Sequence, residues 1–317
     1  MKLRSRLIFP IASMVSRRID KWKFTAIEDQ SLIRNHLVQK GQHTAYGKDY
    51  GFKTIHSSET FSKAVPMVDY EQIKSYINRI KGGEKNVLWP GLPKYFAKTS
   101  GTTSGVKYIP LTKESMPNHF GSARNALLNY AAKTGKAEFF DGKLIFLSGS
   151  PELDTSSIVP TGRLSGIVNH EVPNWLKKSQ VPSYETNCID DWERKVERIV
   201  EETIGLDMRL ISGIPPWVQM YLEKLLEVSG KRTIIDLFPH FSMFVYGGVN
   251  YEPYRNTLEN LFGTSVASVE TYPASEGFFA FQDEQGDASL LLNTRSGIYF
   301  EFVELEEIHK ECPIRLP

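Results

Sequence analysis

The sequence predicts an α/β fold, in which helices flank a β-sheet. Short apolar segments typical of buried strands occur at KLIFLSG (143–149), MRLISG (208–213), FSMFVYGG (241–248) and ASVETY (267–272). Between them, residues 191–205 and 215–230 place apolar residues on one helical stripe. Strands that alternate with helices indicate a sheet covered by helices.

The pattern changes after Gly277. The segments FFAFQ, SLLLN and IYFEFVEL are separated by polar turns, which is typical of antiparallel strands. We therefore expect a barrel-like β region beside the main sheet, near the C-terminal end of the chain.

Helix signals mark the first half of the chain. The apolar run from Leu7 to Val15 carries basic flanks, but Pro10 interrupts it and Arg17 stands where a signal peptide would be cleaved. This pattern predicts an amphipathic helix, either packed on the protein body, which we favour, or lying on a membrane surface. Asp69 predicts the N-cap of a helix that ends at Gly82.

Two further segments have weaker signals. Thr112 predicts the start of a long helix toward Lys133. Residues 148–182 are rich in Ser, Pro and Gly and predict a long irregular loop that walls a pocket.

Composition excludes several classes of protein. The formal charge of the 317 residues is +1, and no basic stripe interleaved with aromatic residues is present, so nucleic acid is not an expected partner. Cys188 and Cys312 lack the spacing of a zinc site or a disulfide framework. The sequence contains no run of about 20 apolar residues, so stable membrane insertion is not expected. A cytoplasmic protein is expected.

The strongest chemical motif is TSGTTSGVK. Its glycines allow backbone amides to turn toward an anion, its hydroxyl groups donate hydrogen bonds, and its lysine supplies positive charge. The pattern differs from a Walker A loop and from a GxSxG nucleophile elbow. The alternative is a flexible Ser/Gly turn. We interpret the motif as a phosphate-binding loop that comprises Thr99, Ser100, Gly101, Thr102, Thr103, Gly105 and Lys107.

Several segments together resemble one known family. They are HTAYGKDYGF, VPMVDYEQIKSYINRI, TSGTTSGVKYIPLT, VYGGVN, ETYPASEG and YFEFVEL, in this order. The chain resembles the Gretchen Hagen (auxin-responsive) acyl-acid amido synthetases, within the adenylate-forming superfamily of acyl-CoA synthetases and luciferases. The resemblance implies the large N-terminal domain of the adenylate-forming fold.

The resemblance also implies roles for individual residues. The first motif would wrap round the ATP phosphates, with Lys107 as a catalytic cation, and Glu276 would be catalytic through the Mg²⁺ that it holds. Pro273 stands where related sequences often have glycine, which puts one main-chain contact in doubt. The implied adenine and nucleotide contacts are Gly247, Gly248, Val249, Tyr272, Ala274 and Ser275.

The acyl pocket is implied less sharply. An alternative for Arg124 is an ordinary surface ion pair. His170 could act as a base in the amine step, although a loop histidine is more often structural. The implied pocket residues are Arg124, Leu128, Leu164, Ser165 and Ile214.

The implied reaction has two steps. A small carboxylic acid is adenylated by ATP with Mg²⁺, and the acyl group then passes to an amine or amino acid to form an amide. Rival functions are an acyl-CoA ligase that shares the first step and a non-catalytic binding module. The family's third nucleotide motif and its C-terminal lid domain would lie beyond Pro317. We therefore expect residues 1–317 to be an incomplete N-terminal nucleotide- and acyl-binding domain that is inactive alone.

Overall fold

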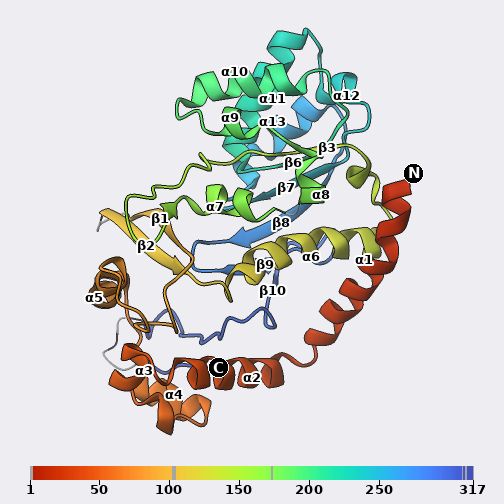
Figure 1. Cartoon of the computed structure of the whole chain (residues 1–317). Helices are drawn as coiled ribbons and strands as arrows, with labels where there is room; N and C mark the ends of the chain where they lie inside the picture. The colour runs from red at the N-terminus through yellow and green to blue at the C-terminus, as the bar shows by residue number, and fades with distance from the viewer. Residues whose placement is uncertain (1–2, 102–104, 173, 309, 311–312, 317) are drawn as a thin grey trace. The chain divides into compact units, whose positions relative to one another are not determined.

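The computed structural model describes residues 3–101, 105–172, 174–308, 310 and 313–316 (Figure 1). Thr102, Thr103 and Cys312 lie outside the described residues. The chain forms two compact units. The larger unit comprises Met1–Arg18, His119–Leu153 and Gly162–Asn293, and the smaller unit comprises Ile19–Asn118, Asp154–Thr161 and Thr294–Pro317.

A seven-stranded sheet organises the larger unit, in the order β10-β9-β8-β7-β6-β3-β5. Strands β5, β3, β6, β7 and β8 run parallel, and β9 and β10 extend the sheet in antiparallel pairs. The α/β prediction is therefore confirmed, and each of the four predicted buried strands is present. The strands are β3 (Lys143–Phe146), β5 (Gln180–Val181), β6 (Met208–Ser212), β7 (Met243–Gly247), β8 (Ala267–Pro273), β9 (Phe278–Phe281) and β10 (Leu291–Leu292).

The strand order reverses once along the chain. From β3 the chain moves to β5 on one side, whereas β6, β7 and β8 follow on the other side of β3. In open parallel sheets, the loops on the two sides of such a reversal lead away from each other at the carboxyl ends of the strands. A crevice is left between them, and ligands commonly bind there. This edge of the sheet is therefore the expected position of a ligand.

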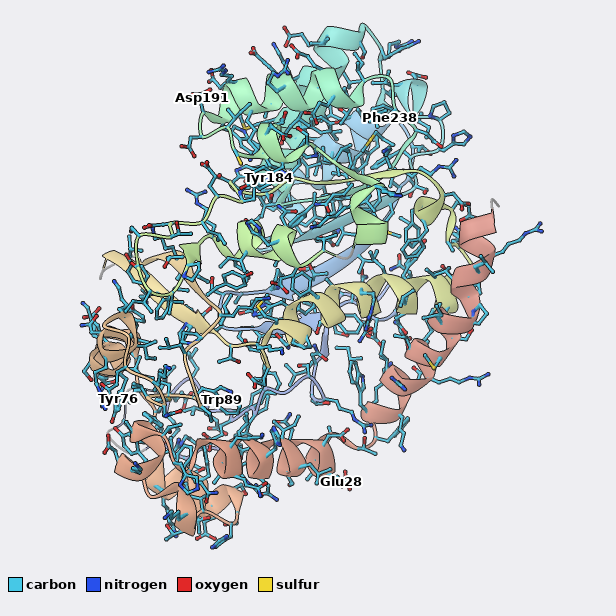
Figure 2. All side chains as sticks on the ribbon, in the orientation of Figure 1. Glu28, Tyr76, Trp89, Tyr184, Asp191 and Phe238 are labelled. Atoms are coloured by element: carbon cyan, nitrogen blue, oxygen red, sulfur yellow. The ribbon has the colours of Figure 1, made fainter. Side chains whose placement is uncertain are left out.

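Three helices, α10, α11 and α13, build the main core of the larger unit. Asp191 caps α10, and its carboxylate accepts a hydrogen bond of 2.8 Å from the backbone N–H of Arg194 (Figure 2). Pro215 begins α11, where its missing N–H costs nothing, and Gly230 ends it with φ of 65°. These helices are α10 (Trp192–Thr203), α11 (Pro215–Ser229) and α13 (Glu252–Phe262), with the short helices α9 (Tyr184–Asn187), α12 (Ile234–Leu237) and η2 (Glu138–Asp141).

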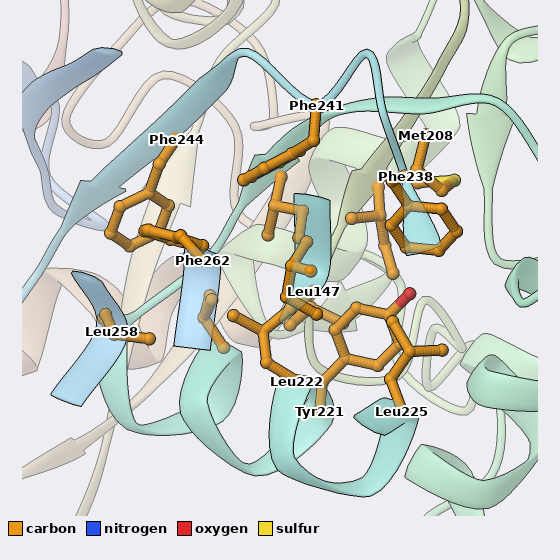
Figure 3. Close-up of a cluster of buried hydrophobic side chains, with 14 of the residues drawn as sticks. Leu147, Met208, Tyr221, Leu222, Leu225, Phe238, Phe241, Phe244, Leu258 and Phe262 are labelled. Carbon is orange, nitrogen blue, oxygen red and sulfur yellow. The ribbon is translucent and has the colours of Figure 1, made fainter. Parts of the chain in front are cut away.

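The core lies between these helices and the sheet (Figure 3). Leu222 and Leu225 of α11 are fully buried among residues that include Phe244 of β7. The hydroxyl of Tyr221, also fully buried, lies 2.7 Å from that of Thr203 on α10, so its polar end has a partner. The apolar stripes predicted from the helical periodicity therefore form this core.

Helix α6 (Met116–Thr134) runs along the opposite side of the sheet from α10, α11 and α13 (Figure 1). It begins four residues after Thr112, whose hydroxyl accepts a hydrogen bond from the Ser115 N–H in the preceding turn. The Asn129 side chain donates to the backbone oxygen of Asp283 over 2.8 Å, which ties α6 to the segment between β9 and β10.

The prediction of a long irregular loop over residues 148–182 is wrong in part. This stretch contains four short elements, and two of them are held by strand pairing, β4 beside β1 and β5 beside β3. Besides β5, the elements are β4 (Thr161–Gly162), α7 (Leu164–Glu171) and α8 (Asn174–Lys177).

The smaller unit combines a β-hairpin with helices. Strands β1 and β2 pair in an antiparallel register from Tyr95 opposite Leu111 to Gly101 opposite Gly105. Asp69 caps α5 and forms a capping box with Gln72, as the sequence predicts. The elements are β1 (Tyr95–Gly101), β2 (Gly105–Leu111), α2 (Ala26–Gly41), α3 (Ala45–Asp49), η1 (Phe52–Thr54), α4 (Ser58–Ala64) and α5 (Tyr70–Lys81).

The barrel-like β region is not confirmed. β9 and β10 extend the main sheet instead of closing on themselves. The segment IYFEFVEL (298–305) forms no strand, and an isolated bridge joins Phe302 to Leu316. Apolar periodicity identified extended backbone but could not identify its pairing partner, which depends on contacts remote in sequence.

The N-terminal helix is confirmed as α1 (Leu3–Trp22), with Pro10 inside it. It buries Ala12 and Ile19, whereas Leu7 and Ile11 are exposed. Among the described residues, no helix combines the length and hydropathy needed to cross a bilayer.

Truncation of a core residue tests this packing. Leu222→Ala removes buried methyl groups and leaves a cavity, so we expect the free energy of unfolding in urea to fall by about 2–5 kcal/mol. The control Val228→Ala lies on the same helix, where Val228 is 56% exposed, and should change it by less than about 0.5 kcal/mol. Equal losses in the two variants would contradict the assignment of the buried face.

Candidate functional site

Four loops follow the carboxyl ends of adjacent parallel strands in the larger unit. They begin after β3, β6, β7 and β8, and therefore share one edge of the sheet. Three of the predicted site residues, Ile214, Gly248 and Glu276, lie in these loops. The topology thus collects residues that are far apart in sequence at the edge where α/β sheets bind ligands.

The loops after β6 and β7 touch at Gly248. Its φ is 83°, a left-handed conformation that favours glycine. A Cβ at this position would lie 3.4 Å from Cγ2 of Ile214. The structure therefore brings together a residue predicted to contact adenine and one predicted to line the acyl pocket. Val249, the next residue, is exposed.

Gly247 has a different physical requirement. It pairs with Thr271 across β7 and β8, and a Cβ there would lie 2.0 Å from the Thr271 backbone oxygen. The Thr271 hydroxyl also donates a 2.9 Å hydrogen bond to the Tyr246 backbone oxygen. Gly247 is thus required for close strand pairing, whatever its relation to a ligand.

The ETYPASEG motif is a strand followed by a tight turn. The backbone N–H groups of Ala274 and Gly277 donate to each other's carbonyl oxygens over 2.8 and 3.2 Å. Ser275 and Glu276 occupy the two positions between them. Glu276 is exposed, and no partner holds its carboxylate among the described residues. The turn therefore presents a carboxylate that is free to bind a ligand or metal.

Tyr272 lies just before this turn. Its side chain is 53% exposed, and its ring packs edge-on against Phe279 with centroids 5.5 Å apart. The contact supports the ring and leaves part of it accessible. Pro273, which follows, pairs with Phe278 at an irregularity in the β8–β9 ladder, where a residue without an N–H is tolerated.

Helix α7 is held against the loop that follows β3. The Ser165 hydroxyl accepts a 3.2 Å hydrogen bond from the Gly149 N–H, and Asn169 donates to the Ser148 hydroxyl over 3.1 Å. Nε2 of His170 lies 2.6 Å from the Pro151 carbonyl oxygen. Because that oxygen can only accept, Nε2 carries a proton in this contact. His170 therefore anchors the loop, as expected of a structural histidine.

Lys195 is a buried cation that the sequence analysis missed. Its Nζ donates to the backbone oxygens of Ser148 and Asn187 over 2.9 and 2.7 Å, and so joins two loops. Burial lowers the pKa of Lys195 to about 8, and the positive charge of nearby Arg163 acts in the same direction. Cys188 and Asp190 act in the opposite direction and raise this pKa. The burial of Lys195 could have been predicted from the sequence, because a residue three positions after Trp192 lies on the same, buried face of α10.

The predicted acyl residues on α6 differ in exposure. Leu128 is buried, and Arg124 is exposed and hydrogen bonds to the side chain of Asn125. No carboxylate pairs with Arg124 among the described residues. Leu164 is partly buried at the start of α7.

The phosphate-loop motif lies in the smaller unit. It joins two antiparallel strands, in which Thr99 pairs with Lys107, Ser100 with Val106 and Gly101 with Gly105. Nζ of Lys107 lies 5.6 Å from the ring centroid of Tyr70, and no acidic side chain pairs with it among the described residues. No acidic side chain in the described part of the chain therefore compensates the lysine charge. The predicted site residues thus fall into two sets, one in each unit.

Comparison of the fold with solved structures identifies its class. The chain is similar to an acyl acid amido synthetase determined in complex with 2,4-DB, with a TM-score of 0.73, 17% identity, and coverage of 92% of this chain and 61% of that chain. It also resembles a 2-hydroxyisobutyryl-CoA ligase, with a TM-score of 0.54, 11% identity, and coverage of 83% of this chain and 54% of that chain. The fold is therefore that of the adenylate-forming enzymes.

Sequence comparison identifies the family. The model of the GH3 family N-terminal domain matches residues 16–196, more than half of the chain. The chain belongs to the GH3 family, as its motifs predicted.

Curated relatives match shorter regions. Indole-3-acetic acid-amido synthetase GH3.15 of Arabidopsis thaliana is 40% identical over 170 residues, which are 51% of this chain and 28% of that protein. Jasmonoyl--L-amino acid synthetase JAR4 of Nicotiana attenuata is 24% identical over 164 residues, 49% of this chain and 27% of that protein. The matched region therefore covers under a third of either relative.

Replacement of Gly247 tests the close pairing of β7 and β8. Gly247→Ala must displace backbone atoms of Thr271, and we expect a fall of about 1–3 kcal/mol in the free energy of unfolding. Gly205→Ala is the matched control, since a Cβ there meets nothing within 4 Å. Urea unfolding of the two variants gives the comparison, and an unchanged Gly247→Ala protein would contradict the tight contact.

The lowered pKa of Lys195 predicts a pH dependence. The native state binds fewer protons than the unfolded chain between pH 8 and the ordinary lysine value of 10.5, so this group adds stability as pH rises through that window. The difference in unfolding free energy between wild type and Lys195→Met should rise by about 1–2 kcal/mol from pH 7.5 to 9.5. The same difference for Lys231→Met, at an exposed lysine, should stay flat. A flat Lys195 difference would show that its charge is not penalised by burial.

Proposed function

We propose that this protein adenylates a small carboxylic acid with ATP and transfers the acyl group to an amine or amino acid. The observation that carries the proposal is the β8–β9 turn, which presents the unpartnered carboxylate of Glu276 at the carboxyl edge of the sheet, in a chain of the GH3 family. The names of the relatives, which are amido synthetases, support the choice of reaction.

The first step demands stabilisation of negative charge. The carboxylate of the acid attacks the α-phosphate of ATP, pyrophosphate leaves, and an acyl-adenylate forms. Lys107 has no acidic partner among the described residues, so its charge is available to phosphate oxygens. The hairpin glycines Gly101 and Gly105 leave its backbone unobstructed for the same ligand.

The residues at the sheet edge would bind the remainder of the nucleotide and the acid. Gly248 leaves space for a flat base beside the backbone, Gly247 holds the strand that precedes it, and the exposed face of Tyr272 can stack on the base. Ile214, close to Gly248, would contact the acid. Ala274 and Ser275 belong to the same turn as the metal-binding carboxylate.

Magnesium fits the residues present. Mg²⁺ is usually held in proteins by one or two carboxylates together with phosphate oxygens and water. Glu276 is exposed and unpaired, and no group of three or more His, Cys, Asp and Glu side chains that could hold a metal occurs among the described residues. Bound there, the ion would neutralise charge on the phosphates.

In the second step an amine attacks the acyl carbonyl and AMP leaves. His170 is a poor candidate for the base, because its Nε2 proton already bonds to the Pro151 carbonyl. An acyl-CoA ligase would share the first step and differ only in the acceptor, so coenzyme A and amino acids must be compared as acceptors. A cytoplasmic location completes the proposal, in keeping with the free thiol of Cys188.

Exchange of labelled pyrophosphate into ATP isolates the first step. The protein from the complete coding sequence should show exchange that depends on a carboxylic acid from a panel of small acids. Lys107→Ala and Glu276→Ala should each lower the rate at least about 100-fold, because each removes charge stabilisation of the transition state. Lys113→Ala and Glu197→Ala, at exposed positions, are matched controls and should stay within about two-fold of wild type.

Two outcomes would contradict the proposal. Exchange that persists in both Lys107→Ala and Glu276→Ala would show that these groups do not perform the assigned roles. Nucleotide binding without exchange for any acid would favour the non-catalytic binding module.

A further inference from the structure

The smaller unit contains a cavity of about 680 Å³ that none of the predicted site residues line. Its walls come from α2, α3, η1, α4 and α5, from the loop residues 65–67 and 88–89, and from residues 297–303 and 315. They are mostly apolar, and include Leu37, Phe52, Phe61, Val65, Trp89 and Ile298. Trp89 is labelled in Figure 2. The volume lies in the range of small-molecule sites, about 300–1,000 Å³.

Helix α2 places a charged residue at this cavity. Gln30 makes three hydrogen bonds of 2.7–3.0 Å, two to the backbone oxygens of Thr294 and Ile298 and one from the Phe300 N–H. These bonds fix the buried face of α2 against residues 294–300. Arg34, one turn later on the same face, lines the cavity.

The Arg34 guanidinium is only partly satisfied. Arg34 is 7% exposed, and its Nε is buried without a hydrogen-bond partner. One terminal nitrogen donates to the Asn35 side chain over 3.1 Å, and the guanidinium carbon lies 5.9 Å from the ring centroid of Tyr299. The Tyr299 hydroxyl lies within reach of the same guanidinium. A buried cation whose partners are all neutral retains a desolvation cost that an anion would relieve.

The other charges of the cavity are already paired. Glu301 accepts from the Ser62 hydroxyl over 2.6 Å and forms an ion pair of 3.2 Å with Arg315. Arg34 has no acidic partner among the described residues. The lining therefore carries one uncompensated positive charge.

A second polar group points to the same chemistry. The hydroxyl of Tyr299, which also lines the cavity, is buried beside the Arg34 guanidinium, which can donate to its oxygen but cannot accept its proton. Burial raises the pKa of Tyr299, an effect that nearby Arg34 opposes in part, so the phenol stays protonated at neutral pH. It can therefore donate to an anion beside Arg34.

We propose that this cavity is a binding site for a small amphipathic monocarboxylate. The carboxylate pairs with the Arg34 guanidinium beside the Tyr299 hydroxyl, and an aromatic or branched apolar body fills the space between α2 and residues 88–89. The site lies wholly in the smaller unit and uses no residue assigned to adenylation. A carboxylate bound there is therefore held independently of ATP.

Titration calorimetry with 4-phenylbutyrate tests the proposal, with 4-phenylbutan-1-ol as the neutral probe of the same shape. The protein from the complete coding sequence is titrated without ATP. We expect Arg34→Met, which keeps the length of the side chain and removes its charge, to weaken 4-phenylbutyrate binding at least about 10-fold and to leave the alcohol unchanged. Lys40→Met, at an exposed cation of the same helix, should bind both probes like wild type.

Three controls keep the result interpretable. Far-ultraviolet circular dichroism establishes that Arg34→Met is folded, and Met67→Trp at the exposed rim should weaken both probes by filling the entrance. Pyrophosphate exchange by Arg34→Met should stay within about two-fold of wild type, which separates this site from the proposed acyl site. If wild-type protein does not bind 4-phenylbutyrate, the proposal is overturned, even if the cause is that another part of the protein fills the cavity. Equal affinity of wild type and Arg34→Met for 4-phenylbutyrate also overturns it.

Discussion

The parallel pairing of β7 with β8 is the constraint on which the sheet edge depends. Five residue pairs join the strands, from Met243 and Ala267 to Gly247 and Thr271. The final pair brings the two backbones so close that the first strand must end in glycine. Register errors of one residue would invert every side chain of β8. The position of the turn that presents Glu276 is therefore fixed by strand pairing rather than by the turn itself.

The packing of helices on these strands also fixes the positions of the other loops. Helices α10 and α11 pack on the same strands, and α10 carries both the apolar stripe and Lys195. The charge of this lysine opposes burial, and the ammonium group is held by carbonyl groups from two loops. Its hydrogen bonds hold the two loops in place, while the loss of water around its charge costs free energy. Such a cost is expected where the position of a loop must be fixed.

In the smaller unit, by contrast, two cations lack the hydrogen-bond or charge partners that would offset their cost. Gln30 and Arg34 are one turn apart on α2, yet Gln30 is satisfied by backbone groups while Arg34 keeps an unpartnered Nε. Lys107 is likewise without an acidic partner among the described residues, on a different element of this unit. Unpaired cations of this kind are costly to folding alone and are favourable for binding anions.

Local patterns in the sequence determined the buried strands, the amphipathic helices and the Asp69 cap, because each depends on neighbours within a few residues. The motif order also identified the family. Tertiary structure alone decided that β9 and β10 extend the main sheet, that residues 148–182 contain short ordered elements, and that Ile214 meets Gly248. It also decided the burial of Lys195 and Arg34. These features arise from contacts between residues up to hundreds of positions apart, and neither periodicity nor composition records which distant segment will be the partner.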